Sequence, residues 1–249
     1  MGKLTGKVAV VTGASKGIGA SIAEHLGAEG ASVVVNYATS KSGADAVVKK
    51  IREHGGKAVA VQADVSKQDD IARLFQETKS AFGKLDVLVN NAGIYEFAPL
   101  GEITAEHFHK LFDLNVLGLV LTTREAVKLM GDGGSIINIS SIVGPMPFPT
   151  ASIYSATKAA VDAVTVSLSR ELGPQKIRVN SLNPGMVATE GFSAAGLAES
   201  EFRKSVEATT PLGRIGQPED IAKAAVFLAT EDAGWVTGQT LLLAGGYRM

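Results

Sequence analysis

The chain has 249 residues with 24 basic and 25 acidic side chains, so its formal net charge is −1. This balance argues against nucleic acid as a partner, because binding to phosphates needs an excess of Lys and Arg on one face. The absence of cysteine excludes a disulfide scaffold, a thiolate metal centre and a cysteine nucleophile.

No apolar stretch of the sequence approaches the ~20 residues that a membrane-spanning helix needs. The first residues, Met1 to Gly6, also lack the apolar run of a signal peptide. We therefore expect a protein of the cytoplasm that has no membrane partner.

Short apolar strands alternate with amphipathic helices along the chain. The predicted strands cover residues 8–11, 32–35, 58–62, 86–89, 135–139, 178–182 and 240–244. The predicted helices cover residues 18–29, 44–54, 69–82, 105–113, 116–130, 152–172 and 219–230. Because the strands are apolar throughout, we expect a parallel sheet that helices cover on both faces. The fold class is therefore α/β: one domain, 1–249, with a doubly wound, Rossmann-type sheet of about seven strands.

The segment 184–212 interrupts this alternation. It follows the end of a predicted strand, mixes Gly, Ala and Ser, and contains few large apolar residues. Loops at the carboxyl ends of parallel strands carry the ligand in such sheets. We therefore predict that the segment forms a substrate lid of loosely packed short helices.

A glycine-rich loop, Thr12 to Gly19, joins the first predicted strand to the first helix, with further glycines at positions 13 and 17. At this place the backbone turns tightly and brings N–H groups and the helix N-terminus close to a diphosphate. Two other predicted strands end in turn-forming residues, Asp64-Val65 and Asn90-Asn91-Ala92-Gly93. Residues at successive strand ends fit one nucleotide laid across the edge of the sheet.

Tyr154 and Lys158 lie four residues apart on a predicted helix and share one face. A nearby ammonium favours the phenolate, so we expect Lys158 to lower the pKa of Tyr154 from about 10. A tyrosine so placed can act as a general acid or base. Ser141, at the end of a buried strand, could donate a hydrogen bond to a carbonyl oxygen. Asn115 is a polar residue in an apolar segment and needs a partner.

In this combination and order, the motifs resemble those of the short-chain dehydrogenase/reductase family, in its compact single-domain branch, over essentially the whole chain. The resemblance implies that Tyr154 is the catalytic acid/base and that Ser141 polarises the carbonyl. It implies that Lys158 lowers the tyrosine pKa and binds the nicotinamide ribose, while Asn115 holds a water of a proton relay. It further implies a homotetramer.

The same resemblance places Val187 and Thr189, which follow Pro184-Gly185, at the nicotinamide carboxamide and the diphosphate. No metal site is expected. The predicted cofactor-binding residues are Gly13, Ser15, Lys16, Gly17, Ile18, Gly19, Asn36, Tyr37, Ala38, Ser40, Asp64, Val65, Asn91, Ala92, Gly93, Tyr154, Lys158, Pro184, Gly185, Val187 and Thr189.

The end of the second predicted strand favours NADP(H) over NAD(H). An acidic residue at this place accepts hydrogen bonds from the adenine ribose and repels a 2′-phosphate. Tyr37 occupies the position, and no carboxylate follows before Asp45. Lys16 and Lys41 supply cations nearby. We expect NAD(H) to be used less efficiently; alternatively, both lysines are merely solvated and both cofactors are accepted.

The predicted function is reversible reduction of a small-molecule ketone to a secondary alcohol with NADP(H). The alternatives within the family are a 3-oxoacyl-carrier-protein reductase and a glucose dehydrogenase-like enzyme, because the segment 211–220 is shared by all three groups. Tyr95, Phe97 and Phe148, with Pro145, Met146 and Pro149, suggest an apolar pocket that suits a bulky or aromatic ketone. A protein that only senses NADP is the alternative of another class; it would be expected to lack one of the catalytic residues.

Overall fold

The computed structural model describes residues 2–194, 196 and 199–247. Among these residues, seven parallel strands form one sheet in the order β3-β2-β1-β4-β5-β6-β7. The strands are β1 (Val8–Val11), β2 (Ser32–Tyr37), β3 (Lys57–Gln62), β4 (Val87–Asn90), β5 (Gly134–Ile139), β6 (Ile177–Pro184) and β7 (Thr240–Leu243). The chain begins at the centre, winds outward to β3, and then winds the other way from β4. The predicted doubly wound α/β sheet is confirmed.

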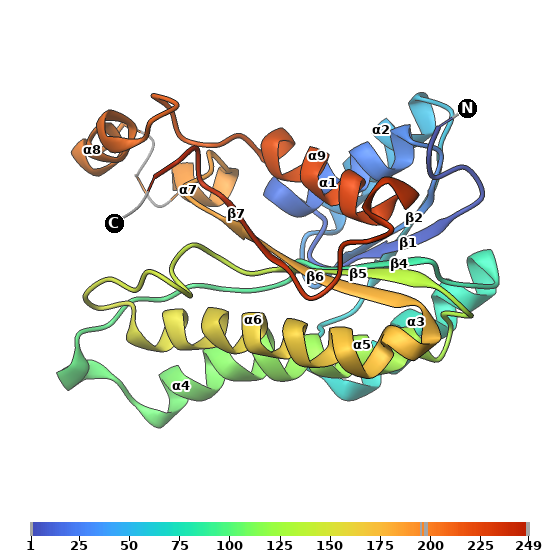
Figure 1. Ribbon diagram of the computed structural model, residues 1–249, viewed down its shortest axis with the longest axis horizontal. Coiled ribbons are helices and arrows are strands. Elements are labelled where there is room, and N and C mark those ends of the chain that lie inside the picture. The colour runs from blue at the N-terminus through green and yellow to red at the C-terminus, as the bar shows by residue number, and fades with distance from the viewer. Residues whose placement is uncertain (1, 195, 197–198, 248–249) are drawn as a thin grey trace.

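Helices cover both faces of the sheet (Figure 1). One face carries α1 (Gly17–Ala28), α2 (Lys41–Glu53) and α9 (Pro218–Ala229), and the other carries α3 (Gln68–Phe82), α4 (Ala105–Phe112), α5 (Leu119–Val127) and α6 (Ser152–Leu172). Short 3₁₀ turns lie at η1 (Leu100–Glu102), η3 (Gly173–Gln175) and η4 (Glu231–Ala233). None of the helices in the described part of the chain is long and apolar enough to cross a membrane.

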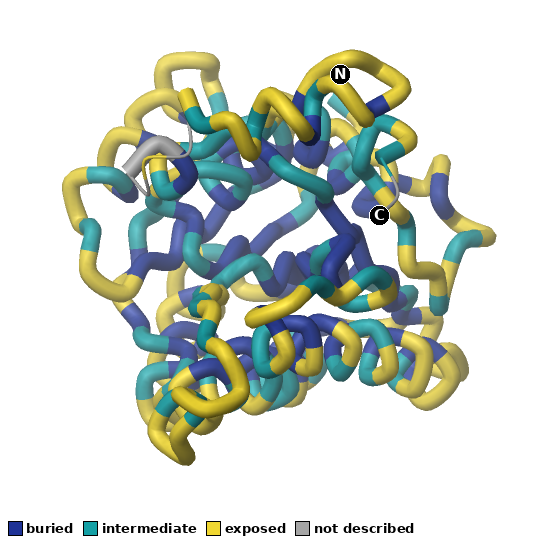
Figure 2. Tube along the Cα trace, turned by 90° about the vertical axis from the view of Figure 1, so that its left-hand side faces the viewer, coloured by how far each residue is buried: buried dark blue, intermediate teal, exposed yellow. Residues whose placement is uncertain are grey.

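A hydrophobic core lies on each face of the sheet, between the strands and the helices. The apolar strands contribute to both cores, because successive side chains of a strand point to opposite faces. In β1, Ala9 and Val11 pack with the helices of one face, whereas Val8 and Val10 pack with those of the other. All four residues are buried. Figure 2 shows buried residues running through the centre of the molecule, with exposed residues on the outer helix faces and loops. This two-sided burial explains why the strand does not alternate apolar and polar residues.

Two predicted helices, 105–113 and 116–130, form one continuous helical stretch. α4 and α5 are joined by a π-helical turn, η2, over Asp113–Gly118. The prediction of two helices with a break is therefore wrong, because the extra residue of the π-turn disturbs the helical spacing without ending the helix.

The predicted lid segment, 184–212, contains two short helices, α7 (Glu190–Ala194) and α8 (Glu201–Thr209). Its residues 195, 197 and 198 lie outside the described residues. Phe192 and Val206 pack with Ile215 in a small apolar cluster separate from the two main cores. The short helices were expected; this cluster was not, and the movement of the segment over a ligand stays a prediction.

Candidate active site

The glycine-rich loop between β1 and α1 is pressed against the segment that follows β4. Gly13 and Gly17 have φ angles of +60° and +58°, which favour glycine. A Cβ atom on Gly13 would lie 2.9 Å from Cα of Ala92, and one on Gly19 would lie 2.4 Å from Nδ2 of Asn91. The close approach thus requires glycine at positions 13 and 19, and the positive φ favours it at position 17.

Two polar side chains join this loop to the end of β4. Asn91 Nδ2 donates hydrogen bonds to the carbonyls of Thr12 and Gly13 at 2.9 and 3.0 Å. In return, Thr12 Oγ1 accepts from the backbone N–H groups of Asn91 and Ala92, both at 3.0 Å. Asn91 therefore shapes the loop through its side chain, and Thr12 contributes to the site in a way that the sequence did not reveal.

The N-terminus of α1 is built to receive an anion. Lys16, the residue before the helix, has an extended backbone. Its side chain accepts no hydrogen bond from the backbone N–H groups of the first turn, and no other described side chain is seen to cap them. The methyl carbon of Thr189 lies 3.4 Å from the Cβ position of Gly17, so the segment after β6 reaches this end of α1. Uncapped N–H groups and the helix dipole together favour a phosphate.

A cavity of about 250 Å³ extends from this loop over the ends of β2, β3 and β4. Its lining residues are Gly13, Ser15, Lys16, Asn36, Ala38, Thr39, Ser40, Ala63, Asp64, Val65, Asn91, Ala92, Gly93, Ile94 and Leu114. Most of the predicted cofactor residues are therefore brought together at one edge of the sheet. The glycine cradle and the uncapped helix fit the diphosphate of a dinucleotide, and the cavity beside them fits its adenosine half.

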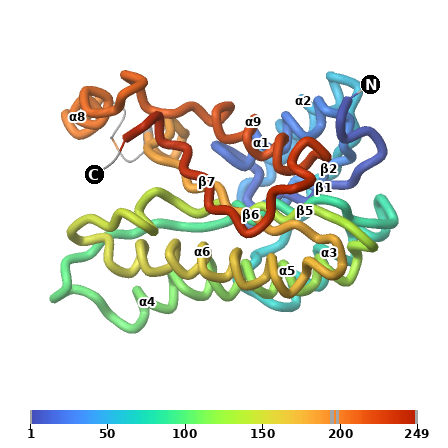
Figure 3. The backbone as a smooth tube through the Cα atoms, in the orientation of Figure 1, coloured from blue at the N-terminus to red at the C-terminus, as the bar shows by residue number. Residues whose placement is uncertain are grey.

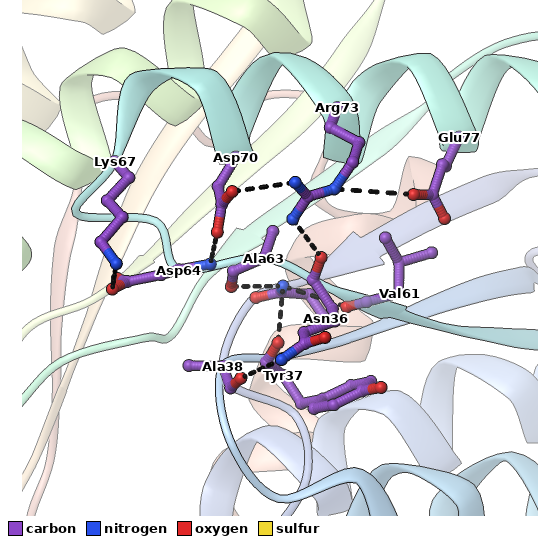
Figure 4. Close-up of polar contacts among 11 residues, drawn as sticks. Asn36, Tyr37, Ala38, Val61, Ala63, Asp64, Lys67, Asp70, Arg73 and Glu77 are labelled. Carbon is purple, nitrogen blue, oxygen red and sulfur yellow. Dashed lines mark hydrogen bonds and ion pairs between the residues drawn. The ribbon is translucent and has the colours of Figure 1, made fainter.

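Asn36 and Tyr37, two of the predicted cofactor residues at the end of β2, have different surroundings (Figure 4). Asn36 is buried; its Oδ1 accepts from the Gly13 N–H at 3.1 Å, and its Nδ2 donates to the carbonyls of Val61 and Ala63. Tyr37 is 7% exposed, belongs to the core and is not among the described residues that line the cavity. Asn36 thus holds the glycine loop and also lines the cavity, whereas the Tyr37 side chain packs in the core, and the contact of either residue with the cofactor stays a prediction.

Among the described residues that line the cavity, the cation is Lys16, and Lys41 is not one of them. Lys41 forms an ion pair with Asp45 at 2.6 Å, on the surface of α2. Lys16 lines the cavity and is exposed. The predicted contribution of Lys41 to phosphate binding is therefore weakened by Asp45, and Lys16 is the cation of the cavity wall.

Asp64 lines the same cavity and is fixed by α3 (Figure 4). Its backbone N–H donates to Asp70 Oδ2 at 2.8 Å, and Arg73 in turn binds Asp70 at 3.0 Å. Burial acts to raise the pKa of Asp64, but hydrogen bonds from Ser66 and the charge of Lys67 outweigh it and hold that pKa below its ordinary value. Asp64 thus presents an ionised acceptor to the cavity.

Asn115 lies in the π-turn and is buried. Its Oδ1 accepts from the N–H of Ile94 at 2.9 Å, while its Nδ2 donates to the Ile94 carbonyl at 2.8 Å and to Thr157 Oγ1 at 3.2 Å. The expected partner of this polar group is therefore present. Because both N–H groups of the amide are in use, a relay water would have to bind Oδ1 or the Asn115 carbonyl, and π-turns commonly mark functional sites.

Tyr154, Lys158 and Ser141 come together where α6 begins and β5 ends. Lys158 Nζ lies 5.8 Å from the centre of the Tyr154 ring, and Ser141 is near enough to the Tyr154 hydroxyl to lower its pKa. A Cβ atom on Gly93 would lie 3.7 Å from Lys158 Nζ and 3.1 Å from Asn115 Oδ1. All four predicted catalytic residues therefore border one point at the carboxyl edge of the sheet.

The pKa values of the pair differ from the expectation. Burial raises the pKa of Tyr154 to about 12, against the hydrogen bond with Ser141 that acts to lower it. Burial also lowers the pKa of Lys158 to about 8, although the charge of Asp162 opposes this. The prediction that Lys158 brings the Tyr154 pKa down toward neutrality is wrong for the groups present here, because desolvation is the largest cause of the shift and the charge of Lys158 is not among its causes.

Asp162 and Asn183 support this centre and were not singled out from the sequence. Asn183 Nδ2 donates to Asp162 Oδ2 at 2.7 Å and to the Ser141 carbonyl at 3.3 Å. Ser181 Oγ donates to the other oxygen of Asp162 at 3.0 Å. Asp162 follows Lys158 by four residues, so the run Tyr154, Lys158, Asp162 on one helix face is a signal that could have identified it.

The end of β6 lies beside the same centre. The Pro184 carbonyl accepts from the N–H of Ile142 at 2.9 Å. A Cβ atom on Gly185 would lie 2.9 Å from Cβ of Ala244, so a glycine is needed where the ends of β6 and β7 meet. Val187 is buried and pairs with Gly216 in an isolated bridge. These contacts hold the start of the 184–212 segment next to Ser141.

Known proteins resemble the chain over its whole length. A family model described as enoyl-(acyl carrier protein) reductase matches residues 13–248. An uncharacterized oxidoreductase of Methylorubrum extorquens is 57% identical, with 100% of both chains covered. A hydroxynaphthalene reductase-like protein of Metarhizium robertsii is 41% identical (98% of this chain, 95% of that protein), and a 3β-hydroxysteroid dehydrogenase of Eggerthella lenta is 42% identical (98% and 94%).

Solved structures agree with these relatives. A dehydrogenase/reductase from Sinorhizobium meliloti has a TM-score of 0.93 at 40% identity, with 98% of this chain and 96% of that chain covered. A short chain dehydrogenase from Burkholderia cenocepacia, in complex with NADP, has a TM-score of 0.92 at 33% identity, with 98% of each chain covered. The similarity therefore includes the edge of the sheet where the site lies.

Proposed function

The chain belongs to the short-chain dehydrogenase/reductase family and is an oxidoreductase, and we propose that it reduces a ketone to a secondary alcohol with NADPH. The observation that carries the proposal is the convergence of Tyr154, Ser141 and Lys158 beside a glycine loop and a cavity that fit the diphosphate and the adenosine half of a dinucleotide. The relatives support it, since two of them are named for a hydroxynaphthalene reductase and a hydroxysteroid dehydrogenase.

In the proposed reaction the chain positions the ketone and supplies one proton. When bound, the nicotinamide supplies the hydride. Ser141 donates a hydrogen bond to the carbonyl oxygen, and the Tyr154 hydroxyl donates its proton as this oxygen becomes an alkoxide. The Lys158 ammonium adds positive charge beside the forming anion. Because the pKa of Tyr154 is about 12, its hydroxyl is protonated at neutral pH, the form that reduction requires.

The choice of NADPH rests on the cavity wall near the end of β2. Lys16, Ser15 and Ser40 line it, and the exposed Ala38 stands beside them. A charge-assisted hydrogen bond from Lys16 to a 2′-phosphate is worth roughly 1.5–3 kcal/mol, about tenfold to a hundredfold in affinity. The Burkholderia relative, solved in complex with NADP, supports the same choice.

The test is consumption of NADPH, followed by absorbance, with a panel of cyclic, aryl and acyl-thioester ketones, each also run with NADH. Turnover of a simple ketone with NADPH supports the proposal. Turnover confined to the acyl thioesters identifies an acyl-carrier or coenzyme A substrate instead. Tight NADPH binding without turnover of any ketone contradicts the proposal and leaves a protein that only senses the nucleotide.

A further inference from the structure

Three aromatic side chains form a cluster beside Tyr154, and two of them contact its ring. The ring centres of Tyr95 and Phe97 lie 6.2 and 6.0 Å from that of Tyr154, and Phe97 lies 5.2 Å from Phe148. Tyr95 and Phe97 also contact each other, at 5.8 Å. We call Tyr95, Phe97 and Phe148 the aromatic wall. Tyr95 and Phe97 are 46% and 47% exposed and adjacent to each other, so they form a contiguous exposed apolar patch of the kind that marks a binding site.

The backbone that carries Tyr95 and Phe97 is anchored at every second residue. Ile94 forms two hydrogen bonds with Asn115, through its N–H and its carbonyl. Glu96 forms an ion pair with Lys110 of α4. The N–H of Ala98 donates to the Thr150 carbonyl at 2.9 Å. The anchored residues alternate with the two aromatic residues, so the strand-like segment presents both rings on the side of Tyr154.

The loop that carries Phe148 is stiff as well. Pro145, Pro147 and Pro149 restrict its backbone. Thr150, which accepts the hydrogen bond from Ala98, has a φ of +70°, a conformation that a non-glycine residue adopts only at a cost. Figure 3 shows this loop and the segment after β4 extending beyond the same end of the sheet. The aromatic wall is therefore preformed, and a ligand need not order it.

The chemistry of the aromatic wall selects a kind of substrate. Its faces offer apolar area and π-stacking, with the Tyr95 hydroxyl as the polar group of the three rings, which favours a flat aromatic ring over a polar sugar or a flexible acyl chain. A flat ring stacked on these faces would bring a carbonyl in its own plane toward Tyr154. Resting on the proposed function, we propose that the aromatic wall makes the enzyme specific for cyclic ketones whose carbonyl ring is fused to an aromatic ring.

The test compares 2-tetralone with trans-2-decalone, each with NADPH. The two ketones share a fused bicyclic skeleton, and neither carbonyl is conjugated, but only 2-tetralone has an aromatic ring. The ratio of their kcat/KM values therefore reports recognition of the planar ring. Phe97→Leu and Phe148→Leu keep apolar volume and remove one stacking face each. We expect each to lower the ratio by about threefold to tenfold, mainly through KM for 2-tetralone.

The matched control is Phe227→Leu, which removes a 41% exposed phenylalanine from α9 on the opposite face of the sheet and should leave the ratio unchanged. Should Phe97→Leu fail to bind NADPH as the parent does, Tyr95→Leu carries the same test. An unchanged ratio in the wall variants, or an equal loss for both ketones, overturns the aromatic specificity while the reductase function stands. Failure of the parent to oxidise NADPH with either ketone or the wider panel overturns the proposed function itself.

Discussion

Lys158 Nζ donates a hydrogen bond of 2.9 Å to the carbonyl of Ile139, so the ammonium is held inside the protein at the end of β5. Lys158 is buried, and this burial lowers its pKa to about 8. A charged group with a lowered pKa reduces the stability of the folded state at neutral pH, because the unfolded chain binds its proton more tightly. The active site therefore costs stability at a residue that the proposed reaction needs.

We expect Lys158→Met to be more stable than the parent at pH 7 and to lose this advantage by pH 10. Between pH 8 and 10.5 the unfolded parent holds the proton that the folded parent releases, so the parent gains stability with rising pH. The difference in free energy of unfolding should shrink by about 2 kcal/mol between pH 7 and 10. Urea titrations at both pH values measure it. The exposed Lys79→Met serves as control, and a constant advantage for Lys158→Met would contradict the lowered pKa.

Removal of the Tyr154 hydroxyl should abolish proton transfer and leave cofactor binding intact. Tyr154→Phe keeps the ring that contacts Tyr95 and Phe97, so we expect kcat to fall by about 10²–10⁴ while NADPH affinity is unchanged. Steady-state kinetics and fluorescence titration with NADPH measure the two effects. Tyr247→Phe, in the small cluster near Phe192, is the matched control. If the kcat of Tyr154→Phe lay within threefold of that of the parent, Tyr154 would not be the general acid.

Cofactor choice is best tested at Ala38, because the preceding Tyr37 is buried. A carboxylate at the buried Tyr37 would destabilise the core, whereas Ala38 is exposed and lines the cavity. Ala38→Asp should repel the 2′-phosphate and shift the preference toward NADH. Lys16→Ala should weaken the binding of NADPH by about tenfold and leave the binding of NADH unchanged. The ratio of kcat/KM for the two cofactors checks both, and equal use of them by the parent would contradict the role of Lys16.

Asp162 is expected to be a positioning residue whose loss changes the pH profile. Its carboxylate raises the pKa of Lys158, and it binds Ser181 and Asn183. In Asp162→Asn the Lys158 pKa falls further, so less ammonium remains at pH 7. The alkaline limb of kcat should therefore move to lower pH, and activity should recover in part at pH 6. A loss of the same size at every pH would indicate a structural role alone; the exposed Asp132→Asn controls for a general charge effect.

Local pattern in the sequence was enough for the fold and for the principal site residues. Strand and helix periods are properties of neighbouring residues, and they predicted the doubly wound sheet, with α6 over Ser152–Leu172 as found. The glycine spacing and the Tyr154–Lys158 pair are equally local, since one follows from backbone conformation and the other from helix geometry.

The tertiary structure decided what those residues experience. The pKa of Tyr154 depends on burial by segments distant in the chain, so its rise could not be inferred from the pair alone. The hydrogen-bond partners of two asparagines could not be inferred either. Asn36 bonds with Gly13 and β3, and Asn183 joins Asp162 to Ser141. Sequence spacing reports which side chains share a helix face or a strand end. Desolvation, hydrogen-bond partners and the stacking of rings on Tyr154 arise only when distant segments pack, because each depends on the distance between them.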